Sequence, residues 1–186
     1  MLRRRILSDL ENLESLHVSH AWVPGAENIR PSPETLNIKH QTLEGIGTQY
    51  AAESDFILEH IFSVSLDVGA DGKLFADAGS VALINDTGRV FMPNQFPYVV
   101  PAGTHHWVMW YPIGLRFESL GPARLLQPAD VAITANIEQD LLQLLHHHEG
   151  FDFVWYVNPK MTVPDIFHVQ VFWTSWDVRP KCAFAC

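Results

Sequence analysis

Cysteine is scarce in this sequence of 186 residues. The two cysteines, Cys182 and Cys186, lie in the final "KCAFAC" segment, without a CxxC motif and without a histidine at zinc-site spacing. The two cysteines therefore say little about function, and their spacing predicts no zinc site. No cysteine stands fourth from the end, so the prenylation pattern is absent as well. A reducing, intracellular location is therefore expected.

Positive charge is also in short supply. The sequence has 12 Lys and Arg residues and 21 Asp and Glu residues, which gives a formal net charge of −9 and a pI near 5.5. A protein that follows a phosphate backbone needs a basic face, so nucleic acid is not an expected partner. Small anionic ligands are still compatible with this charge, because a few local cations suffice to bind them.

Long apolar runs are missing too. No segment reaches the roughly 18 to 20 continuous apolar residues of a membrane span. The opening "MLRRRILSDLENLESL" carries Asp9, Glu11 and Glu14 where a signal peptide needs an apolar stretch. We therefore expect a soluble, cytoplasmic protein that does not bind membranes.

The overall composition is typical of a folded globular protein. Hydrophobic residues make up 47% of the sequence and charged residues 18%, far from the composition of a disordered protein. The length suits one domain. We expect residues 1–48 to form an N-terminal helix and arm, 49–176 an α+β core, and 177–186 a tail.

Periodicity and turn residues predict the order of the elements. A capping-box spacing at Ser8 and Glu11 predicts a helix over 8–18, and Pro24, Pro31 and Pro33 indicate an extended arm after it. Further helices are expected within 48–62 and over about 130–148, the second ended by Gly150. Strand-like runs are expected at 63–68, 80–86, 89–93, 97–100, 105–111, 115–120, 151–157 and 167–173, with a hairpin turn at 86–88. This order predicts an α+β fold with an antiparallel sheet of five to seven strands and helices mainly on one face.

The last predicted strand carries two polar residues in an apolar segment, "FHVQVFW". Alternation along a strand sends Phe167, Val169, Val171 and Trp173 to one side, and it brings His168 and Gln170 together on the other. A histidine there is a candidate nucleophile or base, and the glutamine amide is a candidate donor to an oxyanion. A half-exposed polar strand face explains the same pattern without any chemistry.

The surrounding order of elements resembles the histidine-triad superfamily, especially its hexose-1-phosphate uridylyltransferase branch, where glutamine replaces the last histidine. The resemblance implies that His168 attacks the α-phosphorus of a nucleotide and that Gln170 holds the phosphoryl oxygens. It makes Asn158 the polar residue ahead of the loop. The first triad position is Ile166 here, and no glycine-rich stretch precedes His168. Lys160, Arg116 and Arg89 are the candidate cations for phosphate.

A second resemblance covers residues 50–173. The stretches "NQFPYVVPAGTHHWVMW" and "VNPKMTVPDIFHVQVFW" are similar to the N-acetylglucosamine-induced-protein family of fungi and protists. The matching positions are Asn94, Phe96, Pro97, Tyr98, His106, Trp107, Val108, Trp110, Asn158, Pro159, Thr162, Val163, Pro164, His168, Gln170 and Phe172. This resemblance adds Asn94 and His106 to the expected ligand-binding residues. It links the chain to amino-sugar metabolism by the family's name alone and implies no reaction.

Other histidines and the tryptophans allow further interpretations. "VPAGTHHW" also resembles half of a cupin motif, so His106 is either a metal ligand of a cupin-like site, a ligand-binding residue or a strand-end side chain bonded to a loop. His146, His147 and His148 end a predicted helix, where histidine suits the free carbonyls better than a shared metal ion. The tryptophans of the strands are expected in the core.

Three functional hypotheses follow and stay open at the level of sequence. The first is a histidine-triad-like protein that binds a nucleotide or nucleotide-sugar phosphate and transfers or hydrolyses it through His168. The second is a ligand-binding or regulatory module of the same fold without catalysis, and the third is a cupin-like metal protein. For the first two we expect a small phosphorylated ligand and no cofactor or metal, and a homodimer is left open.

Overall fold

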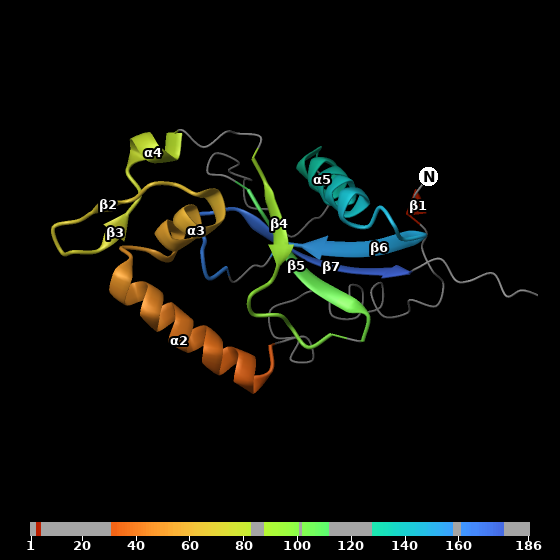
Figure 1. Ribbon diagram of the computed structural model, residues 1–186, viewed down its shortest axis with the longest axis horizontal. Helices are drawn as coiled ribbons and strands as arrows, with labels where there is room; N and C mark the ends of the chain where they lie inside the picture. The colour runs from red at the N-terminus through yellow and green to blue at the C-terminus, as the bar shows by residue number, and fades with distance from the viewer. Residues whose placement is uncertain are drawn as a thin grey trace, which may run out of the picture.

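The computed structural model describes residues 3–4, 31–82, 88–100, 102–111, 128–157 and 161–176. Its helices are α2 (Pro33–Gln49), α3 (Glu53–Phe62), α4 (Ala78–Ala82) and α5 (Pro128–Leu144). Its strands are β1 (Arg3–Arg4), β2 (Asp67–Val68), β3 (Leu74–Phe75), β4 (Val90–Pro93), β5 (Thr104–Trp110), β6 (Gly150–Tyr156) and β7 (His168–Trp176). Figure 1 shows their arrangement.

The main sheet has the order β1-β6-β7-β5-β4, and β2 pairs with β3 in a small separate ribbon. The pairs β6·β7, β5·β7 and β4·β5 are antiparallel, whereas β1 runs parallel to β6. The α+β class is thus confirmed, with five strands in the main sheet of the described chain. One pair departs from the antiparallel pattern expected throughout.

One face of the sheet packs against α5. The apolar side chains of β7 that alternation placed together, among them Val169, Val171 and Trp173, form this core with α5 residues such as Ile137 and Leu141. Ile137 and Leu141 are 0% exposed. Trp107 and Trp155 pack on the same cluster, as predicted for tryptophans of the strands. Burial of this apolar stripe is what holds α5 on the sheet.

The helices are divided between the two sides of the sheet, where the sequence had suggested mainly one. A second apolar cluster joins Ile57 and Leu58 of α3 to Ile166 before β7, and Trp110 of β5 packs against it. Trp110 pairs with His168, so this cluster touches the face opposite α5. Figure 1 shows α2 and α3 set to one side of the sheet and α5 over it.

The extended arm predicted around Pro31 and Pro33 is wrong for residues 33–48, which belong to α2. Pro33 occupies the start of the helix, where its missing N–H costs no hydrogen bond, and its fixed φ suits the first turn. The Ser32 Oγ accepts the backbone N–H of Thr35 at 3.2 Å and caps the helix. Proline here begins a helix and does not break one.

Three predicted strands are also corrected. The run at 80–86 begins inside α4, where the Asp77 carboxylate accepts the Ser80 N–H at 2.6 Å and favours a helical turn. The run at 97–100 is not a strand, and the run at 63–68 contributes only the two residues of β2. The predicted helix at 8–18, the strand at 115–120, most of the turn at 86–88 and the tail lie outside the described residues.

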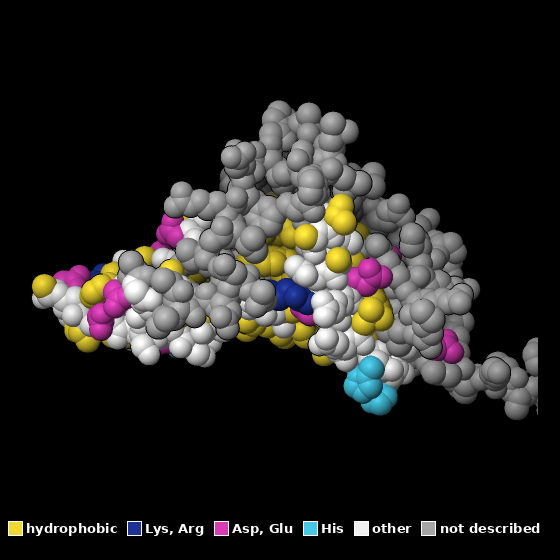
Figure 2. Space-filling view, turned by 90° about the horizontal axis from the view of Figure 1, so that it is seen from above, with side chains coloured by type: hydrophobic (Ala, Val, Ile, Leu, Met, Phe, Trp, Pro, Cys, Tyr) yellow, Lys and Arg dark blue, Asp and Glu magenta, His cyan; other side chains and the backbone are white. Residues whose placement is uncertain are grey.

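Figure 2 looks down on the molecule from the α5 side, and a group of histidine side chains stands out on this face. His146 and His147 are exposed beyond the end of α5, with ring centroids 3.7 Å apart. The His146 Nδ1 lies 3.0 Å from the Gln143 carbonyl, which matches the helix-end role predicted for this histidine. None of the helices in the described part of the chain has the length and apolarity to cross a membrane.

Candidate functional site

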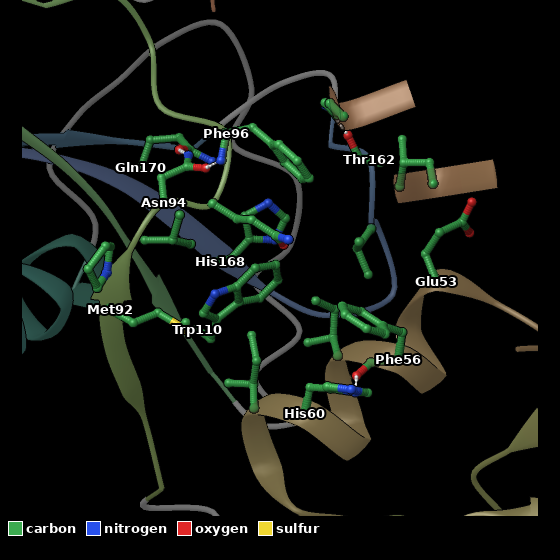
Figure 3. A pocket seen from close by; sticks show the side chains of 18 of the residues that line it. Glu53, Phe56, His60, Met92, Asn94, Phe96, Trp110, Thr162, His168 and Gln170 are labelled. Atoms are coloured by element: carbon green, nitrogen blue, oxygen red, sulfur yellow. Dashed lines mark hydrogen bonds between the residues drawn. The ribbon is translucent and has the colours of Figure 1, made fainter. Parts of the chain in front are cut away.

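A cavity of about 240 Å³ lies between α2, α3 and the sheet face opposite α5. Its apolar walls come from the two helices and from β4 and β5, and they include Leu43, Ile46, Phe56, Ile57, Met92, Val108 and Trp110. Its polar lining consists mainly of Lys39, Glu53, His60, Asn94, Thr162, His168 and Gln170. Figure 3 shows His168 between the Asn94–Gln170 pair and Thr162, with Trp110 and Phe56 on the apolar side.

His168 is held in one orientation at the start of β7. Its Nδ1 lies 2.9 Å from the Ile166 carbonyl, which can only accept, so Nδ1 carries the proton. Its ring packs on Trp110 with 4.4 Å between centroids. Nε2 is left with the lone pair and has no protein partner among the described residues. The imidazole therefore offers a base or nucleophile to the cavity.

Burial keeps this imidazole neutral. The side chain is 5% exposed, and desolvation lowers the pKa of His168 below its ordinary value. The bond to the Ile166 carbonyl opposes this shift, while the charge of Lys39 adds to it. The neutral, nucleophilic form is thus the main form at pH 7.

Ile166, which the histidine-triad resemblance would align with the first triad histidine, contributes its backbone and not its side chain to the site. The side chain is 0% exposed and belongs to the apolar cluster with Ile57 and Leu58. Its carbonyl is the group that orients His168. The backbone at position 166 is therefore sufficient to orient the His168 ring. The isoleucine side chain itself offers no polar group to a ligand.

A relay of hydrogen bonds sets the amide of Gln170. The backbone N–H of Tyr98 donates to the Nδ1 of His106 at 2.9 Å, so the proton of His106 is on Nε2. That Nε2–H donates to the Gln170 Oε1 at 2.7 Å, and the Asn94 Nδ2 donates to the same oxygen at 2.9 Å. With Oε1 occupied by two donors, the Gln170 NH₂ group is the part left to donate to a ligand.

Asn94 is fixed in turn by the loop after β4. Its Oδ1 accepts the backbone N–H of Phe96 at 2.8 Å, and its own backbone N–H donates to the His106 carbonyl at 3.0 Å. The Asn94 side chain is therefore oriented with its amide toward Gln170. Asn94, Phe96 and Tyr98 belong to the "NQFPY" segment singled out in the sequence, and all three line the cavity.

Three of the predicted site residues, His168, Gln170 and Asn94, come together at the cavity. His106 is 5% exposed and does not line it, since it lies behind Gln170 and stacks on Phe172 with 4.2 Å between centroids. Burial lowers the pKa of His106 to about 4, so it stays a neutral hydrogen-bonding group. Asn158, Lys160 and Arg116 lie outside the described residues.

Arg89, a candidate phosphate cation, is placed elsewhere. It immediately precedes β4 and forms an ion pair with Asp140 of α5, with 2.7 Å between Nη2 and Oδ1, and it also donates to Gln139. Arg89 is not among the described residues that line the cavity. It ties the sheet edge to α5, on the side away from His168.

The contribution of α2 and α3 to the site was missed in the sequence. Lys39, Leu43 and Ile46 follow one another at helical spacing, so they would have fallen on one face had 33–49 been recognised as a helix. Trp110 packs on the second apolar cluster, as expected for a tryptophan of the strands, and it also lies against His168, which was not expected. Thr162 was matched in the sequence without a role, and here it accepts a hydrogen bond from the Lys39 Nζ at 2.9 Å.

A cupin-like metal centre finds no support in the described part of the chain. No group of three His, Cys, Asp or Glu side chains that could hold a metal ion is present there. Both ring nitrogens of His106, the residue of the cupin-like motif, are engaged by protein groups. α5 also occupies the sequence position where a cupin barrel would continue in strands.

Comparison with known proteins is informative about the fold. No protein-family model matches the chain, and no curated protein matches it either. A solved structure, the crystal structure of HTC1, is similar over 87% of this chain and 82% of its own, with a TM-score of 0.52 and 19% sequence identity. At this identity the similarity extends to the fold alone. The two family resemblances drawn from the sequence stay predictions.

Proposed function

We propose that this protein binds a small phosphorylated ligand, a nucleotide or nucleotide sugar, and transfers or hydrolyses its nucleotidyl group through His168. The observation that carries the proposal is the fixed, neutral imidazole of His168, with its Nε2 lone pair free of protein partners among the described residues. The oriented amide of Gln170 beside it supports the same reaction. We expect the protein to act in the cytoplasm.

The proposed step is an in-line displacement at phosphorus. The Nε2 lone pair forms an N–P bond, the P–O bond to the leaving phosphate breaks, and that phosphate departs with the electron pair. The imidazole then carries positive charge, which the Ile166 carbonyl stabilises by accepting the Nδ1–H. The Gln170 NH₂ group donates to the phosphoryl oxygens as charge builds on them. Water or a second phosphate then takes the nucleotidyl group from His168.

Intact-protein mass spectrometry after incubation with UDP-glucose or a dinucleotide tests this proposal. We expect a mass increase that corresponds to one nucleotidyl group, and we expect it to be lost in His168→Ala. His40→Ala is the matched control, since His40 is exposed on α2 and does not line the cavity. An adduct that survives in His168→Ala would rule out this histidine as the nucleophile.

A binding protein without turnover is the second candidate. The observation in its favour is Ile166, whose buried side chain provides no acid or base for the leaving group. Under this alternative, a nucleotide binds in calorimetry but yields neither an adduct nor a hydrolysis product. The same two measurements on the wild-type chain thus separate the candidates.

A further inference from the structure

Lys39 stands apart in the electrostatics of the cavity. Among the described lining residues it is the single Lys or Arg, and Glu53 is the single Asp or Glu. The whole chain carries a formal charge of −9, so a positively charged side chain at the cavity contrasts with the negative charge of the protein as a whole. The lysine comes from α2, outside the sheet that carries His168 and Gln170.

Lys39 is positioned at the cavity and close to the proposed nucleophile. Its Nζ donates to the Thr162 Oγ1 at 2.9 Å, which joins α2 to the segment before β7 across 123 residues of sequence. Its charge is one of the causes that lower the pKa of His168. Lys39 and His168 also line the same cavity, so a ligand bound there can contact both side chains.

The rest of the cavity is suited to an apolar body of limited size. Phe56 and Ile57 of α3, Met92 of β4 and Trp110 of β5 supply flat and aliphatic surface, and Figure 3 shows Phe56, Met92 and Trp110 on one side of His168. The volume of about 240 Å³ is below the roughly 300 to 1,000 Å³ that encloses a drug-sized ligand. One moiety of a ligand fits inside it, and the remainder of a nucleotide sugar would extend beyond.

We propose that Lys39 selects anionic ligands for this site, and that the ligand is an organic phosphate whose compact apolar or aromatic portion fills the cavity beside Trp110 and Phe56. This rests on the proposed function in that it uses the same cavity and His168. It adds a specificity residue from α2 and a ligand class. α2 then provides the charge recognition while β7 provides the nucleophile.

Calorimetric titration of the full chain with matched charged and neutral probes tests the selection. The probes are UMP against uridine and phenyl phosphate against phenol, which differ in the phosphate alone. We expect Lys39→Ala to weaken binding of the phosphates roughly 10- to 100-fold and to leave the neutral probes unchanged, because a charge-assisted hydrogen bond is lost. Lys39→Arg keeps the charge and should retain most of the affinity.

Lys73→Ala is the matched control. Lys73 also carries one positive charge and contacts α2, since its Nζ donates to the Gly47 carbonyl at 2.7 Å, but it does not line the cavity. A variant that acts merely through net charge or a loosened α2 would lower affinity here as well. We expect wild-type binding of UMP and phenyl phosphate.

Each remaining outcome decides between the two proposals. If Lys39→Ala binds UMP as the wild type does, or weakens UMP and uridine equally, the selection by Lys39 is overturned and the nucleotide function stands. If phenyl phosphate binds in a Lys39-dependent manner and UMP does not bind, the selection stands and the nucleotide function fails. Absence of binding by all four probes to the wild type overturns both.

Discussion

The two faces of one sheet differ in what they bury. The α5 face is closed by aliphatic and aromatic side chains, and its central members Val169, Val171 and Leu141 are 0% exposed. The opposite face of the same strands buries polar groups, with His106, His168 and Gln170 each at 5 or 6% exposure. Alternate residues of β5 and β7 thus serve a core on one side and a polar network at a cavity on the other.

Apolar and polar side chains contribute differently to the free energy of folding when they are buried. Burying a polar side chain costs free energy unless its hydrogen bonds are made, whereas apolar burial on the α5 face is favourable by itself. The cavity face meets this cost with the relay through His106 and Gln170. Apolar packing occurs on both faces, so the buried polar groups of the second face are the ones that stability alone does not explain.

Removing a buried side chain from the α5 face should cost more stability than any other change considered. Leu141→Ala should lower the free energy of unfolding by about 2 to 5 kcal/mol, because it removes buried methyl groups and leaves a cavity. Leu142→Ala is the matched control: that leucine is 39% exposed on the same helix and should change stability by less than about 0.5 kcal/mol. Urea denaturation measures both, and equal losses would contradict the placement of α5.

The next effect concerns the polar face and depends on pH. Burial lowers the pKa of His106 to about 4, below its ordinary value near 6.5, so the unfolded chain binds this proton first as the pH falls. The stability contributed by neutral His106 is present above about pH 6.5 and is lost between pH 6.5 and pH 4, by about 3 kcal/mol. Urea denaturation across this range should show a smaller loss in His106→Gln. Parallel curves for the two proteins would refute the buried, neutral His106.

A smaller change is expected in the pKa of His168 when the charge of Lys39 on α2 is removed. The charge of Lys39 lowers the pKa of His168, so Lys39→Ala should raise it toward the ordinary histidine value, although burial keeps it below that value. An NMR titration of the His168 ring measures this shift. An unchanged pKa would mean that Lys39 lies too far from His168 to act on a ligand there.

Much of the sheet could be predicted because its signals are local. β5, β6, β7 and α5 follow the alternation of strands and the periodicity of helices, as the side-chain pattern of Val169, Val171 and Trp173 illustrates. α2 could not be read in this way. A proline such as Pro33 can either interrupt a helix or occupy its first turn. The N-cap at Ser32 shows that it occupies the first turn here.

The site was predictable where it lies on one strand and its neighbours. His168 and Gln170 are two residues apart, and Asn94 belongs to a segment with its own pattern. Lys39 and Phe56 reach the cavity only because α2 and α3 fold back against the sheet, and no local pattern reports such a long-range contact. The direction of the hydrogen bonds between His106 and Gln170 could not be predicted either, because it depends on the backbone N–H of Tyr98, which donates to His106.

That relay has a consequence for redesign of the cavity. The Gln170 Oε1 is matched to two donors, and the ring of His106 is matched to a backbone donor on its other side. Replacing Gln170 by histidine would leave the amide of Asn94 and the imidazole of His106 competing for a single ring nitrogen. A substitution at position 94, 106 or 170 therefore leaves a hydrogen-bonding group of the other two without its partner, unless those positions are changed as well.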